Sequence, residues 1–145
     1  TATYRIFYKN SLKTLAGQLQ LPGELQPGAI INILRRASVY VHPSHIENSS
    51  NSICEAMALG MPVIALHTGG NASLIQHGVD GLLVADHDPY LLAATIQQVV
   101  SNPEQSRKMA SNAKARAVIR HNPERIIAKL KEIYQRVIEL HENKK

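Results

Sequence analysis

Short apolar runs that end in polar loops, each followed by a helical pattern, restrict the fold of this chain most. Residues 39–42 form one such run, which leads through a polar loop and a helix that stops at Gly60 to a second run, Val63–Leu66. A third run, residues 81–84, precedes another helical pattern. Strands that alternate with helices predict a parallel sheet covered on both faces. We therefore expect an α/β fold, a three-layer, doubly wound parallel sheet of the Rossmann-like type.

The remaining pattern predicts one more strand and several helices. A helix is expected over residues 1–16 and a short strand over residues 18–21, before Pro22-Gly23. Pro27 marks the start of a helix to about Arg36. Its expected buried residues are Ile30, Ile31, Ile33, Leu34 and Ala37.

The C-terminal part of the chain reads as consecutive helices that begin at prolines. Asp88 before Pro89 predicts one helix start, and an apolar stripe follows at Leu91, Leu92, Thr95, Ile96, Val99 and Val100. A helical extension is expected over about residues 103–141. Its first helix has a small-residue face of Ser106, Ala110, Ala113 and Ala117. Its second has an apolar stripe of Ile126, Ile127, Leu130, Ile133, Tyr134, Val137 and Ile138.

The loop after residue 42 carries two carboxylates, Glu47 and Glu55, with seven residues between them. Ser52 followed by Glu55 is a capping-box pattern, which predicts that the helix starts at Ser52. The first N–H groups of a helix lack internal partners, so small neighbours leave them open to a phosphate. Carboxylates on either side would accept hydrogen bonds from hydroxyls, each contributing roughly 1.5–3 kcal/mol. Hydroxyls on both sides of a diphosphate describe a nucleotide sugar.

Other readings of these residues remain open at this stage. Glu55 could simply close the capping box, and Glu47 could be a solvated loop residue. Histidines and a carboxylate near adjacent strand ends, namely His42, His45, Glu47 and His67, could also form a zinc site. A nucleophilic serine is disfavoured because the G-x-S-x-G motif is absent.

Several motifs occur in a characteristic order along this segment. They are Pro43-Ser44, the pair Glu47 and Glu55, Glu55-Ala56-Met57-Ala58 with Gly60, Pro62-Val63-Ile64-Ala65, Gly69-Gly70, and residues 78–84 with the sequence GVDGLLV. Together they resemble the donor-site segment of the retaining, GT-B-fold glycosyltransferases of the family 4 type. This family includes bacterial glycogen synthase and many mannosyl- and galactosyltransferases. The resemblance covers residues 18–100 well and the C-terminal helices loosely.

The resemblance implies transfer of a hexose from a UDP- or GDP-sugar to a glycan or lipid-linked acceptor, with retention of configuration. It implies that Glu47 is catalytic and holds hydroxyls of the transferred sugar. N–H groups around Ser50–Ser52 would stabilise the diphosphate, and Glu55 would accept bonds from the ribose. The implied substrate-binding residues are Gly23, His45, Ser49, Ser50, Asn51, Ser52 and Glu55, with Gly23 near the base. No metal or other cofactor is required.

The chain departs from the family pattern in several places. Asn48-Ser49 replace a common glycine and aromatic residue, and Ser73 replaces a usual glutamate. The basic pair that holds the diphosphate in the family has no match, and the four expected strands are fewer than the usual number of about six. We expect a single domain over residues 1–145, the C-terminal part of a two-domain enzyme that is inactive alone. The alternative is a non-catalytic nucleotide-sugar-binding or assembly module.

Composition limits the partners and the compartment. A single cysteine, Cys54, excludes an internal disulfide and suits a reducing, cytoplasmic location. Eleven lysines and arginines against five glutamates follow Pro103. This basic third is compatible with peripheral contact with an anionic membrane. Aromatic residues make up only 4% of the chain, which argues against nucleic acid as a partner because stacking on bases needs them.

Overall fold

The computed structural model describes residues 15, 17–85 and 88–143. The chain divides into two compact units, and the boundary in the sequence falls between Ile33 and Leu34. The smaller unit includes a turn in which Leu19 N donates to the Leu15 carbonyl over 2.9 Å, followed by most of helix α3, Pro27–Arg36. The helix expected over residues 1–16 lies outside the described residues, apart from Leu15 in this turn.

The strand expected over residues 18–21 is wrong. These residues form a turn and an extended segment without strand pairing, and their side chains are exposed. A strand needs a neighbour to satisfy its ladder of hydrogen bonds. Among the described residues, this four-residue run has no such neighbour.

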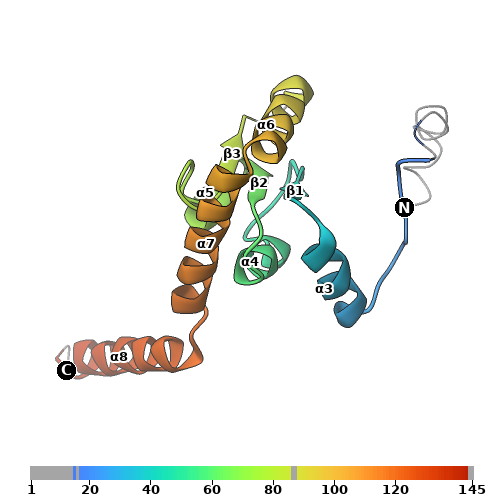
Figure 1. The fold of residues 1–145 in the computed structure, drawn as a ribbon. Coiled ribbons are helices and arrows are strands. Elements are labelled where there is room, and N and C mark those ends of the chain that lie inside the picture. Colours follow the sequence, from blue (N-terminus) through green and yellow to red (C-terminus); the bar gives the residue numbers. More distant parts are fainter. Residues whose placement is uncertain (1–14, 16, 86–87, 144–145) are drawn as a thin grey trace. The chain divides into compact units, whose positions relative to one another are not determined.

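The larger unit contains a parallel sheet in the order β1-β2-β3, labelled in Figure 1. The strands are β1, Tyr40–His42, β2, Val63–Leu66, and β3, Leu82–Val84. Tyr40 pairs with Val63, and Ile64 pairs with Leu82. The three strands predicted for this part of the chain are confirmed to within one residue at each end.

Helices cover both faces of the sheet, as the predicted three-layer fold requires (Figure 1). Val63 and Ala65 pack in one core cluster with residues of α4, Asn51–Ala58, and α7, Pro103–Arg120. Ile64 and Leu66 pack in a second cluster with Val99 of α6, Pro89–Ser101. Successive residues of a strand point to opposite faces, so all four residues of β2 are buried. The short helix α5, Asn71–Leu74, connects β2 toward β3.

The local signals for α6 and α7 are confirmed. Asp88 caps α6 by accepting a bond from Leu91 N over 2.8 Å, and Pro89 is its first residue. The predicted small-residue face of α7 is buried together with Met109. On α6 the buried residues are Thr95 and Val99, whereas Leu91 and Val100 at the edges of the predicted stripe are exposed.

Helix α3 and the last helix of the chain form as predicted, but their apolar faces are not buried. The expected buried residues of α3 are exposed except Leu34, which packs against the first core cluster. Helix α8, Pro123–Glu142, has no buried residue. Helical periodicity reports which face would be buried, but burial itself requires a packing partner. In the described part of the chain, no helix is long and apolar enough to cross a membrane.

Candidate functional site

The loops that follow β1 and β2 meet at the carboxyl edge of the sheet. Thr68 Oγ1 donates to the Ser44 carbonyl over 2.9 Å and joins the two loops. A Cβ atom at Gly69 would lie 1.5 Å from the Glu47 carbonyl oxygen, and one at Gly70 would lie 1.7 Å from that of Asn48. Gly69 also has φ of +49°, which disfavours other residues. The loops therefore pack backbone to backbone at this glycine pair.

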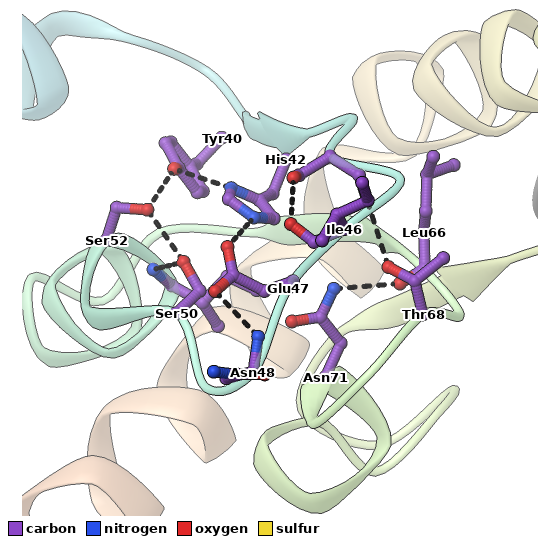
Figure 2. A network of polar contacts seen from close by, with 12 residues as sticks. Tyr40, His42, Ile46, Glu47, Asn48, Ser50, Ser52, Leu66, Thr68 and Asn71 are labelled. Atoms are coloured by element: carbon purple, nitrogen blue, oxygen red, sulfur yellow. Dashed lines mark hydrogen bonds and ion pairs between the residues drawn. The ribbon is translucent and has the colours of Figure 1, made fainter.

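Glu47 is held by two hydrogen bonds, shown in Figure 2. His42 Nε2 lies 2.9 Å from Oε2, and Asn48 N donates to Oε1 over 3.1 Å. The side chains of His42 and Glu47 are only 14% and 22% exposed. An ionised carboxylate has about four acceptor positions, so two remain for a ligand.

A hydroxyl chain connects this carboxylate with the first turn of α4 (Figure 2). Tyr40 Oη lies 3.3 Å from His42 Nδ1 and donates to Ser52 Oγ over 2.7 Å. Ser52 Oγ lies 2.8 Å from Ser50 Oγ. Tyr40 and His42 are two residues apart in β1, so their side chains share one face, and their rings stack with centroids 6.3 Å apart.

Burial raises the pKa of Tyr40, its hydrogen bond to Ser52 lowers it, and the carboxylates of Glu55 and Glu47 raise it further. The Tyr40 hydroxyl is therefore within electrostatic reach of both acids. The sequence pattern did not single out Tyr40, and it indicated His42 only as a member of a possible zinc site. The available signal was the two-residue spacing in a strand that ends at the candidate site.

Helix α4 begins at Asn51, with Ser50 as its N-cap. Ser50 has extended backbone angles, and its Oγ accepts a bond from Ile53 N over 3.4 Å. The helix therefore starts one residue earlier than the predicted Ser52, and the capping-box prediction of Ser52 as the N-cap is wrong by two residues. Ser52 is already inside the helix, where its hydroxyl contacts Tyr40 and Ser50. Glu55 is consequently the fifth helical residue, too far along to close a capping box.

The start of α4 retains donors for an anion. Ser50 satisfies Ile53 N. The N–H groups of Asn51 and Ser52, at the first two helical positions, have no partner within the helix. Asn51 and Ser49 are exposed, and Ser52 is half-buried. Ser50 itself is only 5% exposed. The helix start thus combines small side chains, two N–H groups and the positive end of the helix dipole.

The other predicted site residues are placed as follows. Glu55 is exposed on α4, and His45 is exposed in the loop after β1. Gly23 lies in the smaller unit with φ of +74°. In the part of the chain that the structure describes, no three histidine, cysteine or acidic residues are grouped closely enough to hold a metal ion.

Ser73, which replaces the usual glutamate, forms hydrogen bonds with the neighbouring backbone and with α7. Its hydroxyl donates to the Gly70 carbonyl over 2.7 Å. Its carbonyl accepts a bond from Arg120 over 2.8 Å, and Arg116 lies at 3.5 Å. Arg116 also pairs with the buried carboxylate of Asp80 at 2.5 Å. These contacts connect α7 to the segment that follows the glycine pair.

Comparison with known proteins gives consistent matches. The family described as "Glycosyl transferases group 1" matches residues 5–116. A D-inositol 3-phosphate glycosyltransferase from Thermobispora bispora is 33% identical over 105 residues, which are 72% of this chain and 24% of that protein. The chain therefore spans about a quarter of the length of this curated relative.

Solved structures match most of the chain. HepE of Anabaena in complex with UDP has a TM-score of 0.82 at 25% identity, over 92% of this chain and 36% of that one. Sucrose-phosphate synthase from Thermosynechococcus elongatus has a TM-score of 0.82 at 28% identity, over 94% of this chain and 34% of that one. HepE also matches in its complex with UDP-glucose, with a TM-score of 0.79 at 25% identity, over 92% of this chain and 37% of that one.

Proposed function

The chain belongs to the glycosyl transferases group 1 family, and on this premise we propose that its larger unit binds a nucleotide-diphosphate sugar as the donor of a hexosyl transfer. One observation carries the proposal. Helix α4 begins with small side chains at Asn51, four residues after Glu47 of the preceding loop and four residues before Glu55. The loop follows the carboxyl end of a parallel strand, where open α/β sheets bind ligands.

The helix start would receive the diphosphate. The N–H groups of Asn51 and Ser52 would donate to its oxygens, with the hydroxyls and amides of Ser49–Ser52 alongside. The diphosphate gains negative charge as its bond to the sugar breaks. Fixed donors and the helix dipole stabilise that charge without having to reorganise. This is a metal-independent way of stabilising the leaving group.

The two acids would bind sugar hydroxyls on either side of the diphosphate. Glu47 would hold the transferred hexose near its reacting carbon with the acceptor positions that His42 and Asn48 leave unused. Glu55 would accept bonds from the ribose, and its place in the fifth helical position removes the capping role as an explanation. His45 would contribute beside Glu47.

The complete reaction belongs to a longer protein in this proposal. The Thermobispora bispora relative is about four times as long as the matched region. A further domain would bind a glycan or lipid-linked acceptor, and the product would keep the donor's anomeric configuration. The complexes of HepE with UDP and UDP-glucose favour a uracil base. A cytoplasmic enzyme of polysaccharide synthesis, with peripheral membrane contact, would fit this chemistry.

Substituting Glu47 distinguishes an enzyme from a non-catalytic binding module. In the full-length protein, Glu47→Ala should abolish transfer from the accepted donor among UDP-glucose, UDP-N-acetylglucosamine and GDP-mannose. Calorimetric titration with the matching free nucleotide, UDP or GDP, should show nearly unchanged affinity. Unchanged turnover in this variant would contradict the catalytic assignment.

Substituting Glu55 tests the ribose contact. Glu55→Ala should weaken nucleotide binding by about 1.5–3 kcal/mol, because a charge-assisted hydrogen bond is lost. Glu104→Ala, which removes an exposed glutamate from the first turn of α7, is the matched control and should bind normally. If Glu55→Ala lowers only the melting temperature, the residue has a structural role.

A further inference from the structure

We propose that His42 is a positioning residue, which orients the Glu47 carboxylate toward the donor sugar and connects it to the diphosphate-binding helix start. The proposal rests on the proposed function. His42 Nε2 lies 2.9 Å from Glu47 Oε2, and this pair is mostly shielded from water. His42 is part of a paired strand, whereas Glu47 lies in a loop. The strand therefore provides the fixed point and the loop carries the group that must be fixed.

The partners of His42 define the role of the ring nitrogen that faces Glu47. Tyr40 has one hydroxyl proton, and it is donated to Ser52. The donor at the 3.3 Å contact between Tyr40 Oη and His42 Nδ1 depends on the tautomer of the ring. Nε2 faces a carboxylate, which accepts when ionised. Nε2 is therefore the donor in its contact with Glu47.

This arrangement compensates a repulsion that the proposed site would otherwise contain. Glu47 and a bound diphosphate are both anionic, and like charges a few ångströms apart in a partly desolvated site repel each other. A donor on His42 offsets part of the carboxylate charge while leaving its remaining oxygen positions available. The other contact of Glu47, from Asn48 N, comes from the next residue of the same loop and moves with it.

The hydroxyls extend the support to α4. Tyr40 connects His42 with Ser52, and Ser52 contacts the N-cap residue Ser50. The acid that would hold the hexose and the helix start that would hold the diphosphate are thus parts of one hydrogen-bonded network. Loss of His42 would misplace the acid relative to the leaving group.

Three substitutions in the full-length protein test the proposal. His42→Gln keeps an N–H group that reaches the position of Nε2. His42→Asn has a shorter side chain whose amide does not reach Glu47, and His42→Leu has no donor. We expect kcat with the accepted donor sugar to fall by about 10- to 100-fold in the Asn and Leu variants, as for a misplaced reacting group. The Gln variant should stay within about threefold of the native protein, because it restores the hydrogen bond.

Nucleotide titration and the folding of the variants distinguish a positioning role of His42 from a nucleotide-binding or purely structural role. Titration with UDP or GDP should give a similar Kd for all variants, and the matched control His121→Leu, at the exposed end of α7, should have native kcat. The Gln and Asn variants alone decide the question if the Leu variant does not fold. Equal kcat in these two variants, whether native or reduced, would overturn the inference. A native protein that neither binds these nucleotides nor turns over a donor would instead overturn the proposed function.

Discussion

The two loops at the carboxyl edge of the sheet have opposite chemical characters. The loop after β1, residues 43–50, presents a carboxylate, hydroxyls and amides. The loop after β2, residues 67–70, ends in two glycines whose missing side chains let it contact the first loop directly. The first loop contributes functional groups, and the second contributes the space in which those groups can be placed. A substitution should therefore affect chemistry in the first loop and geometry in the second.

The largest effect is expected in the glycine loop. Gly70→Ala would place a methyl group 1.7 Å from the Asn48 carbonyl oxygen and push the loops apart. Thermal unfolding should show destabilisation at or above the upper end of the ~1–3 kcal/mol typical of overpacking, together with loss of transfer activity. Gly69→Ala should behave similarly, with added strain from the positive φ.

Gly28→Ala is the matched control for this prediction. Gly28 lies in α3, and a Cβ atom there would meet nothing within 4 Å. Alanine also favours helices, so this variant should be as stable as the native protein or more stable. A Gly70→Ala variant with native stability and activity would remove the spatial role assigned to the second loop.

A medium effect is expected at the serines of the first loop. Ser50→Ala removes the N-cap of α4 and should lower the free energy of unfolding by about 1 kcal/mol, within the usual range of 0.5–2 kcal/mol. Ser52→Ala leaves the cap in place and should cost less. Urea unfolding of both variants checks the order. A larger loss of unfolding free energy in Ser52→Ala than in Ser50→Ala would instead support the predicted N-cap at Ser52.

A smaller effect is expected from Tyr40→Phe, which removes one hydroxyl of the network. We expect a loss of about 0.5–1 kcal/mol, at the lower end for a hydrogen bond, because Ser52 still contacts Ser50. Native kcat would show that the network beyond His42 is not needed for turnover. Unchanged unfolding free energy would show that the bond to Ser52 contributes nothing.

Alkaline pH gives the smallest signal. Burial raises the pKa of Tyr40 above its ordinary value near 10. In the unfolded chain this tyrosine ionises first, so the folded state binds more protons above pH 10 and loses stability as pH rises through its own pKa. The native protein should therefore lose stability more steeply than Tyr40→Phe as the pH rises above about 10. Parallel curves would indicate that the Tyr40 hydroxyl is not shielded from water.

The sequence predicted the β1–β3 region well because local and tertiary signals agree there. Runs of buried β-formers alternate with caps and glycine stops, and each strand finds a neighbour. The position of Glu47 at the sheet edge followed from the same pattern. The glycine pair was recognised as one of the motifs in this segment.

The remaining errors have physical reasons. A capping box is a local pattern, and the contact of Ser52 with Tyr40 that overrides it joins residues twelve positions apart. The partnership of His42 and Glu47 depends on how a loop folds back over a strand, which spacing does not report. The apolar faces of α3 and α8 are correct as patterns, yet burial depends on packing partners that a periodicity cannot show.

The central claim is that the start of α4 binds the diphosphate between two acids. The most direct test is a crystal structure of the full-length protein with bound UDP or GDP. The account predicts phosphate oxygens within hydrogen-bond distance of Asn51 N and Ser52 N, a ribose hydroxyl on Glu55, and Glu47 facing the position of the sugar. A nucleotide bound elsewhere, or a diphosphate that does not contact the start of α4, would contradict it.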